Sequence, residues 1–411
     1  MKKRLLTFLG TGNYQPSVYC FEGQEKETSF VQVALCQFLQ PEEMVVFVTS
    51  EAKSKKWQSL KQAVNEEFSG LDIKTVEIPL GGNEDEVWQI FERIVEEVHA
   101  GDSLSVDITH SFRSLPIIAL ACAQYLRTLK NIALKGIYYG AWEAKEEREG
   151  RQYSPVFDLA PFVELMDWSE AVETFDRSGD MSKLNSLFNA EVIPRQKASK
   201  GADREARLLR DVGEGLLKVS QRMATCRGKK IYTDPLLGRI SKRLDELEHD
   251  YDPPKAFKPL LSVIRGKIKE VQIAKSCLSD EVRRGLEAVK WCIQHGLVQQ
   301  AYTLLQETLI THFCQLTDRD MWESESRQEV SMALGLYHMA RNNWKASAKE
   351  KTDFVENVWS LAGEELCDLY NKLTARRNDI NHAGTVNMAS EHRLAKEIKD
   401  YLSSAIALLE K

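Results

Sequence analysis

The segment RNDINH (residues 377–382), near the end of the chain, sets an arginine and a histidine five positions apart. An arginine can hold a scissile phosphate, and a histidine with an ordinary pKa of about 6.5 can move protons on and off the 2′ and 5′ oxygens of RNA. Asn378 lies between them and could orient either group. Arg377, Asn378 and His382 are therefore candidate catalytic residues for RNA cleavage without a metal ion.

A similar spacing between an arginine and a histidine occurs elsewhere in the chain. Arg93 to His99 and Arg243 to His249 fit the same loose arginine-to-histidine pattern. The first pair lies in an amphipathic helical stretch, and the second lies among Asp and Glu residues. We interpret both as surface pairs, so sequence context has to distinguish residues 377–382.

Arg377 continues an apolar helical stripe. The stripe repeats at positions i, i+3, i+4 and i+7 and consists of Leu366, Leu369, Tyr370 and Leu373. A charge on such a face needs a partner or a function, and the open alternative is a structural salt bridge at the end of a core helix. On a straight helix His382 would lie about 140° around from Arg377. A second copy of the motif, or a helix end near Gly384, would bring both groups to one phosphate.

The elements that must position these residues differ between the two ends of the chain. Residues 1–145 alternate short apolar runs with helical periodicity, and the five runs read as strands are LLTFLG, MVVFVTS, IKTVEIPL, SLSVDIT and IALKGIYYG. Five strands separated by helices predict a Rossmann-like, doubly wound and mostly parallel α/β sheet. From about Pro161 onward the pattern is helical, which predicts an all-α C-terminal half.

The length and the breaks in the pattern predict three parts. At about 100 to 200 residues per domain, a chain of 411 residues is too long for one. We expect an α/β domain over 1–160, a helical connector over 161–258 and an all-α domain over 259–411. The charged stretch 194–248 is interpreted as a solvated part of the connector, and the Pro-rich stretch 251–259 as a boundary.

A dense group of donors follows the fourth predicted strand. The segment DITHSFR (107–113) leaves this strand just before an apolar helix whose first turn contains Pro116. The backbone and dipole of a helix start favour an anion. This predicts a phosphate cradle made of Thr109, His110, Ser111, Phe112 and Arg113. The alternative is that Thr109 and Ser111 only cap the helix while Arg113 is solvated.

Three other strand ends add small, polar or aromatic residues at the same predicted edge of the sheet. They are Gly10, Thr11, Gly12, Asn13 and Tyr14 after the first strand, Thr49 and Ser50 after the second, and Tyr139 and Gly140 at the fifth. Residues 10–15 do not form the dinucleotide fingerprint G-x-G-x-x-G, and no Walker lysine follows. Because parallel strands end at one edge, we expect a single ligand crevice there.

The composition limits the class of protein. Hydrophobic residues make up 43% and charged residues 28%, as in soluble globular proteins, and the net charge of −6 disfavours non-specific coating of nucleic acid. A local basic pocket stays compatible with that charge. The eight cysteines form no C-x-x-C pair and are expected to be reduced thiols, with neither zinc nor disulfides. The short apolar start is not a signal peptide and no stretch could span a bilayer, so we expect a cytoplasmic protein without membrane partners.

Five segments together resemble one family. LTFLGTGNY, DITHSFR, YYGAWE, GLVQQAYTLLQETL and RRNDINH look like segments of the CRISPR-associated CARF-HEPN ribonucleases, the DxTHG-type ancillary effectors of type III systems. The motifs support residues 1–145 and 260–411, and length and helicity alone support the middle. The resemblance implies a CARF sensor for a cyclic oligoadenylate and a HEPN ribonuclease in one chain.

The same resemblance implies a mechanism. Two subunits would each contribute an R-x(4-6)-H motif, so a homodimer or higher oligomer is expected. Arg377 would hold the phosphate, His382 would act in proton transfer and Asn378 would orient one of them. Attack by the 2′-hydroxyl of single-stranded RNA would leave a 2′,3′-cyclic phosphate and a 5′-hydroxyl, with no cofactor. The activator is expected to be cyclic tetra-adenylate, although Ser111 replaces the glycine of the D-x-T-H-G motif.

Two other functions stay open. One is a CARF sensor that regulates a partner or transcription without ribonuclease activity and uses its helical half for dimerisation. No helix-turn-helix with basic recognition residues is visible in the sequence, which disfavours this reading. The other is a nucleotide-dependent metabolic enzyme, which would lack a phosphate-loop lysine and a metal-ligand cluster. Whether the CARF crevice also degrades its activator, through Asn13, Thr109 or His110, is a further alternative.

Overall fold

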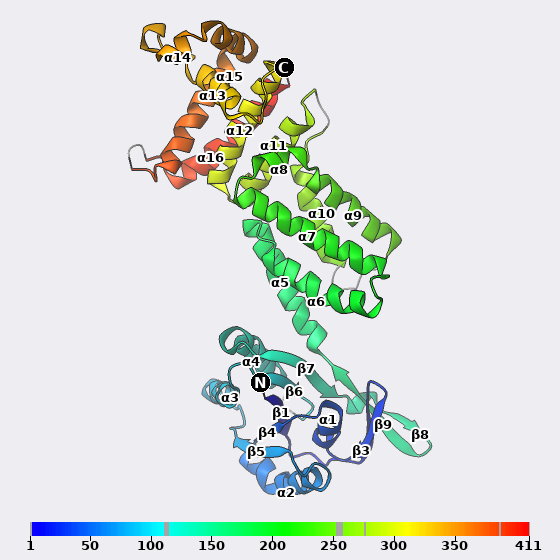
Figure 1. The fold of residues 1–411 in the computed structure, drawn as a ribbon. Helices are drawn as coiled ribbons and strands as arrows, with labels where there is room; N and C mark the ends of the chain where they lie inside the picture. The colour runs from blue at the N-terminus through cyan, green and yellow to red at the C-terminus, as the bar shows by residue number, and fades with distance from the viewer. Residues whose placement is uncertain (1, 111–114, 252–257, 275–276, 386–387, 411) are drawn as a thin grey trace. The chain divides into compact units, whose positions relative to one another are not determined.

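The protein folds into an α/β unit and a helical unit (Figure 1). The computed structural model describes residues 2–110, 115–251, 258–274, 277–385 and 388–410. The compact units are residues 1–167 and 168–411, and each is described by itself. The predicted fold class, an α/β domain followed by an all-α half, is confirmed.

The first unit is built on a nine-stranded sheet. Its order is β3-β2-β9-β7-β6-β1-β4-β5, and β8 pairs with β9. The strands are β1 (Lys3–Leu9), β2 (Ser17–Phe21), β3 (Gln24–Thr28), β4 (Glu43–Val48), β5 (Asp72–Glu77), β6 (Ser103–Asp107), β7 (Ala133–Gly140), β8 (Glu146–Arg148) and β9 (Arg151–Asp158). The five predicted strands are β1, β4, β5, β6 and β7, and they run parallel.

Helices cover both faces of this sheet, as a doubly wound fold requires. They are α1 (Val31–Leu39), α2 (Ser50–Glu67), α3 (Glu84–Glu97) and α4 (Leu115–Lys130). Side chains of β1 alternate between two apolar clusters. Leu6 and Phe8 pack with residues of α3 and α4, and Leu5 and Leu9 pack with residues of α1 and α2. The alternation of a strand thus supplies both layers from one segment.

The prediction missed four strands beside the parallel core. The stretch 146–158 forms the hairpin β8–β9, and β9 pairs antiparallel with β7. Strand β2 pairs with β9 and β3 with β2, which extends the sheet. Strand β3 (QEKET) and β8 (EER) consist of polar residues, so they lack the apolar alternation from which strands are recognised.

The second unit consists of helices around one continuous core. They are α5 (Ala160–Ser178), which begins before the division, α6 (Ser182–Ala198), α7 (Arg204–Ala224), α8 (Gly228–Thr233), α9 (Leu236–Asp250), α10 (Lys258–Val271), α11 (Asp280–Gln294), α12 (Val298–Leu316), α13 (Ser324–Gly335), α14 (Ala346–Lys349), α15 (Thr352–Asn381) and α16 (Glu391–Leu409). One cluster of buried side chains extends from Trp168 to Leu409.

The structure therefore has two compact units where the sequence analysis expected three parts. The charged stretch 194–248 is not a solvated connector, because Leu209, Val212 and Leu216 of α7 are fully buried in the shared core. Its charges lie on the outer side of amphipathic helices. The Pro-rich boundary falls mainly on residues 252–257, which lie outside the described part of the chain.

Helix α15 carries the predicted apolar stripe. Leu366, Leu369, Tyr370 and Leu373 are all buried, as expected. The helix is interrupted at Gly363, whose φ of 67° and ψ of 171° are not helical. Residues 364–381 thus form a separate straight segment that ends in the RNDINH motif.

Candidate functional site

The edge of the sheet at which we expect the ligand crevice lies where the strand order of the first unit reverses. The parallel strands β4 and β6 flank β1, and the chain reaches β4 before β6. Leu9 of β1 is paired with Val48 of β4, and Asp107 of β6 with Tyr138 of β7, so the four carboxyl ends share one edge. The register thus places residues 10–14, 49–50, 109–110 and 139–140 at one edge of the sheet, and their binding of a ligand stays a prediction. Ligands of open α/β sheets bind at such a switch point.

Asp107 ties the two central strands together at this edge. Its carboxylate is fully buried and accepts hydrogen bonds from Thr7 Oγ1 (2.6 Å) and from Thr109 Oγ1 (2.6 Å) and N (2.9 Å). Burial raises the pKa of Asp107, and these donors oppose the rise. The sequence analysis did not assign Asp107 a role. The available signal was a pair of polar residues, Thr7 and Asp107, inside otherwise apolar strands.

Thr109 and Gly140 shape the crevice through their mutual contact. The Thr109 hydroxyl donates to Asp107 and accepts from the Gly140 N–H at 2.8 Å, so its hydrogen bonds join β6 to β7. A Cβ on Gly140 would lie 2.9 Å from Val31 Cγ2 and 3.3 Å from Tyr19 Cε1, so only glycine fits. The helix cap considered above involves residues 111–114, which lie outside the described part of the chain.

His110 and Tyr14 lie together in the crevice. Their ring centroids are 4.2 Å apart. Burial lowers the pKa of His110 to about 4, so its imidazole is neutral at neutral pH. Its Nε2 is buried and has no hydrogen-bond partner in the part of the chain that the structure describes. A neutral imidazole nitrogen can donate to or accept from a ligand, depending on its tautomer.

The segment after β1 is closed by its own tyrosine. Tyr14 Oη accepts from the Gly10 N–H at 2.8 Å and donates to the Gly10 carbonyl at 3.0 Å. Thr11, Gly12 and Asn13 are exposed on the loop between them. Lys56 lies 5.5 Å from the Tyr14 ring centroid and adds a positive charge. The loop thus offers backbone donors and a cation to an anionic ligand.

The remaining expected binding residues have local partners. Thr49 is buried and caps α2 by accepting from the Ala52 N–H at 3.2 Å, and Ser50 donates to Glu77 at the end of β5. Tyr139 donates to Glu143. Of the nine strand-end residues outside the phosphate cradle, Tyr14 packs against His110, and a Cβ added at Gly10 would lie 3.4 Å from the His110 carbonyl oxygen. Ser111, Phe112 and Arg113 lie outside the described residues.

Arg377 differs sharply from the arginine before it. Arg376 forms two hydrogen bonds with the Glu397 carboxylate, at 2.6 and 3.3 Å. Arg377 is half-buried, and its Nε is buried without a hydrogen-bond partner among the described residues. Over the same residues Arg377 forms no ion pair, so the structural salt bridge considered above is not observed. Asn378 and His382 are exposed.

The helix end expected near Gly384 is confirmed. Helix α15 ends at Asn381, His382 is its C-cap, and Ala383 and Gly384 have φ values of 55° and 65°. The Gly384 N–H donates to the Asp379 carbonyl at 2.9 Å, which closes the turn. Asp379 Oδ2 accepts from the Ala389 N–H at 3.0 Å. The His382 N–H still donates to the Asn378 carbonyl at 2.9 Å, so the chain leaves the helix directly after His382.

Other contacts fix the end of α15 against α12. Gln306 Nε2 donates to Tyr370 Oη at 3.2 Å and to Thr374 Oγ1 at 2.8 Å, inside the core. Asn381 Oδ1 accepts from Gln299 Nε2 at 3.4 Å. The segment GLVQQAYTLLQETL, which contributed to the resemblance, thus supports the candidate catalytic segment directly.

The two competing pairs are surface pairs, as predicted. Arg93 lies on α3 and forms an exposed ion pair with Glu96 at 3.2 Å. Arg243 lies on α9 and pairs with Asp211 of α7. Neither arginine is left unpaired.

Metal-ligand clusters and membrane-spanning helices are both absent from the described residues. No group of three or more His, Cys, Asp or Glu side chains there could hold a metal ion. None of the described helices combines the length and the apolar character needed to cross a membrane.

Comparison with known proteins relates the first unit to a family. Residues 4–143 match the family described as "CRISPR system endoribonuclease Csx1, CARF domain". "CRISPR-associated protein MJ1674" of Methanocaldococcus jannaschii is 25% identical over 344 residues, which are 69% of this chain and 53% of that protein. The chain thus spans about half the length of this relative.

One solved structure was also compared. "Enterococcus italicus Csm6 bound to cyclic hexa-2′-fluoro-hexa-dAMP" aligns over 100% of this chain and 94% of its own, with a TM-score of 0.45 and 11% identity. Residues 4–143 are thus similar to the CARF domain of that family, and the chain is similar to a CRISPR-associated protein.

Proposed function

We propose that the protein is an endoribonuclease of CRISPR antiviral defence that a cyclic oligoadenylate activates. The first unit is the sensor, and the helical unit cuts single-stranded RNA. The observation that carries the proposal is the unpaired, half-buried Arg377 at a helix end whose exposed C-cap is His382. A guanidinium with a buried, unsatisfied Nε is costly, and it gains a partner when a phosphate arrives.

The sensor half of the proposal rests on the CARF match and on the switch-point crevice. A cyclic oligoadenylate presents phosphates, ribose hydroxyls and adenine edges. The backbone of residues 11–13 and Lys56 suit the phosphates, and the free Nε2 of His110 suits an adenine or hydroxyl group. The expected ring is cyclic tetra-adenylate.

The chemical step is attack by a 2′-hydroxyl on the neighbouring phosphorus. His382 takes the hydroxyl proton as the new P–O bond forms, and Arg377 stabilises the charge that develops on the phosphate. The bond from phosphorus to the 5′ oxygen breaks, and that oxygen takes up a proton. The products are a 2′,3′-cyclic phosphate and a 5′-hydroxyl, and the step needs no metal ion. Asn378, one turn before His382, orients the imidazole.

Two copies of the chain complete the site in this proposal. The acid that protonates the leaving oxygen is His382 of the second copy. The first unit offers a surface for pairing, because α4 and the start of α5 expose a set of apolar side chains: Ile117, Tyr125, Leu129, Phe162 and Met166. Apolar patches of this kind on soluble proteins mark interfaces, and a self-complementary patch produces a two-fold dimer.

The test is RNA cleavage by the full chain with cyclic tri-, tetra- or hexa-adenylate and an excess of a metal chelator. Cleavage is expected with one ring size. Mass spectrometry should show cyclic phosphate ends on the RNA products. The cleavage rate of His382→Ala should be at least about 100-fold lower than that of wild type. Activator binding by that variant should equal wild type. Cleavage by His382→Ala at the wild-type rate would refute the mechanism. Activator-dependent DNA binding without cleavage would indicate the regulator instead.

A further inference from the structure

The loop between α7 and α8 lies beside the candidate catalytic segment. Two adjacent residues of α12 contact both: Gln299 Nε2 donates to Asn381 Oδ1, and Gln300 Nε2 donates to the Ala224 carbonyl, each at 3.4 Å. The charge of Arg377 also acts on the thiol of Cys226, where it opposes the rise in pKa that burial causes. The end of α7 and the end of α15 are thus neighbours in the helical unit.

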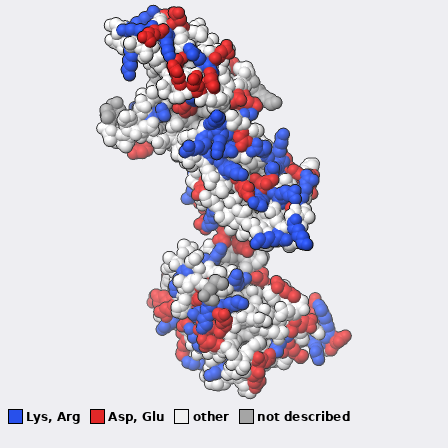
Figure 2. All heavy atoms as spheres, viewed as in Figure 1, with Lys and Arg blue, Asp and Glu red and all other residues white. Residues whose placement is uncertain are grey.

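This loop and α8 carry three cations that the protein does not neutralise. Arg227, Lys229 and Lys230 are exposed, and their side chains form no ion pair or hydrogen bond with any described residue. Arg222 and Arg239, by contrast, share the Asp234 carboxylate. Figure 2 shows Lys and Arg gathered where Figure 1 labels α8 and α11. In a chain of net charge −6 this cluster is a local positive field.

An exposed aromatic ring follows the cations. Trp322, in the turn between α12 and α13, is 37% exposed. Lys229 Nζ lies 5.4 Å from its ring centroid, and the Tyr232 ring lies 6.4 Å from it. Cations along a backbone path and an aromatic ring for a base are what single-stranded nucleic acid requires. The position of these groups beside Arg377 favours an RNA substrate over an acidic protein as the ligand.

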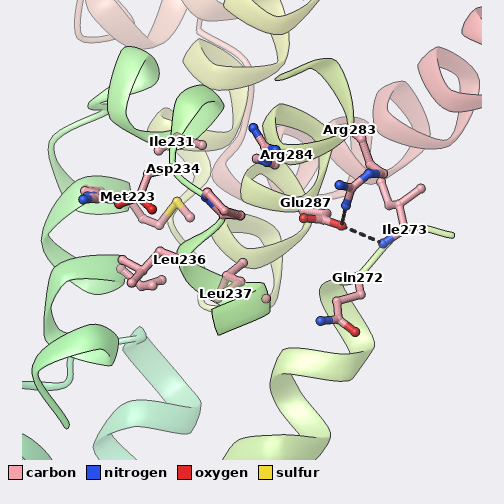
Figure 3. A pocket seen from close by; sticks show the side chains of 14 residues that line it. Met223, Ile231, Asp234, Leu236, Leu237, Gln272, Ile273, Arg283, Arg284 and Glu287 are labelled. Carbon is pink, nitrogen blue, oxygen red and sulfur yellow. Dashed lines mark hydrogen bonds and ion pairs between the residues drawn. The ribbon is translucent and has the colours of Figure 1, made fainter. Parts of the chain in front are cut away.

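A pocket of about 240 Å³ lies beside α8, and arginines that line it hold this helix in place (Figure 3). From the pocket side, Arg222 donates to the Lys230 carbonyl at 3.4 Å, and Arg284 donates to the Tyr232 carbonyl. These carbonyls at the end of a short helix would otherwise lack partners. The pocket arginines therefore satisfy the backbone of α8.

We propose that Arg227, Lys229, Lys230 and Trp322 form a docking track that leads single-stranded RNA to Arg377. The proposal rests on the ribonuclease function proposed above and adds the residues that position the substrate. The lysines bind backbone phosphates and Trp322 stacks on a base, and the track carries no reacting group. RNA longer than the site would be held on one side of the scissile bond.

The test compares two lysine pairs in the full chain carrying His382→Ala, so that bound RNA stays uncut. The track pair is Lys229→Ala/Lys230→Ala. The control pair is Lys197→Ala/Lys200→Ala, which are also exposed and unpaired among the described residues, at the opposite end of α7 and about 30 Å away. Fluorescence anisotropy with labelled single-stranded RNA and activator gives the Kd at several salt concentrations.

The track pair should weaken binding roughly tenfold and reduce the slope of log affinity against log salt by about 1.4, which is two phosphate contacts. The control pair should stay within about twofold of the His382→Ala parent. Equal effects of both pairs would overturn the track. Trp322→Ala should weaken binding at least about fivefold, and Trp322→Phe should restore most of it, because a ring of either type stacks. Equal binding by Ala and Phe would also overturn it.

The same variants with His382 intact separate the two proposals. If the wild type cuts RNA and the track pair raises KM with little change in kcat, both proposals stand. If the track pair cuts like the control pair, the track is refuted and the ribonuclease stands. If the wild type cuts no RNA with any ring size, the ribonuclease is refuted, and the anisotropy comparison still decides whether RNA binds here.

Discussion

Arg376 and Arg377 are adjacent, yet among the described residues one is paired with a carboxylate and the other is not. Glu397 neutralises Arg376 through two hydrogen bonds. The Nε of Arg377 is buried without a described partner, although a protein normally pairs such a group. A group held at a cost in stability is typical of a functional site. The sequence showed that Arg377 interrupts an apolar stripe, but only the structure distinguishes it from its paired neighbour.

Substitution of the two arginines should therefore give opposite phenotypes. Arg377→Ala should abolish activated RNA cleavage while leaving the free energy of unfolding within about 1 kcal/mol of wild type, because an unsatisfied donor leaves along with its packing. Arg376→Ala should retain most cleavage and lose about 1 kcal/mol of stability with its ion pair. Urea unfolding and a cleavage assay on both variants provide the comparison. Equal loss of cleavage in both would argue against a specific role for Arg377.

His110 should impose a pH dependence on stability. Its pKa in the folded protein is about 4, below the usual 6.5, because it is buried. Between these two pH values the imidazole binds a proton in the unfolded state and not in the folded state. The contribution of His110 to the free energy of unfolding is therefore full above pH 6.5 and is lost as the pH falls toward 4. The loss is at most about 3 kcal/mol. Unfolding of wild type and His110→Asn from pH 4 to 7 should show a steeper decline in wild type, and parallel curves would contradict this assignment.

At the scale of elements, the crevice depends on contacts that pin strand ends to one another. Asp107 joins β1 to β6, Thr109 joins β6 to β7, and Gly140 lets β7 approach α1. The crevice wall is thus a network of buried hydrogen bonds. Such networks specify one arrangement when fully satisfied. In the proposed sensor this rigidity would give the ligand a preformed site.

Two glycines of the crevice offer a matched test of this packing. A Cβ at Gly140 would lie 2.9 Å from Val31, whereas a Cβ at Gly12 would meet nothing closer than 4.0 Å. Gly140→Ala should lower stability by about 1–3 kcal/mol and weaken activator binding, because the wall must shift. Gly12→Ala should change stability little, since φ at Gly12 is not positive. Thermal unfolding and calorimetric titration with the activator would measure both, and equal stability of the two variants would contradict the packing argument.

The helices and strands that could be predicted from the sequence were those with a clear pattern of apolar residues. The five parallel strands were predicted because buried parallel strands are continuous apolar runs, and their shared edge followed from the topology. Strands β3 and β8 were missed because they are polar, and β9 because it contains Pro155 and follows a charged stretch. Helix α7 was misread as solvated because its many charges concealed Leu209 and Leu216 at helical spacing. The partners of Thr109 and Asp107 depend on strand pairing, which spacing alone does not reveal.

At the scale of the whole molecule, the proposal requires two copies. Helix α4 begins at Leu115, five positions after His110 in the sequence, so in this proposal the change on ligand binding would pass to the exposed apolar face of α4. A ligand that favours one packing of this face over another would shift the arrangement of the dimer. Coupling of this kind needs no contact between activator and RNA.

A charge on that face should therefore disrupt pairing. Ile117→Asp, together with Leu129→Asp, should shift the protein from dimer to monomer by analytical ultracentrifugation and abolish activated cleavage, because a desolvated carboxylate opposes association. Leu80→Asp is the control, since Leu80 is a comparably exposed apolar residue of the same unit. A dimer of unchanged stability in the double variant would place the interface elsewhere.

The pairing of β2 with β9 has a consequence for how the protein is made. Ser17 donates to the Gln152 carbonyl across 135 positions of sequence, and Val18 is paired with Tyr153. During synthesis on a ribosome, β2 emerges early, and the backbone edge that pairs with β9 stays unpaired until β9 has been made. An incomplete chain would expose that edge to other chains. Translation that stalls before residue 151 should therefore yield a nascent chain that needs a chaperone.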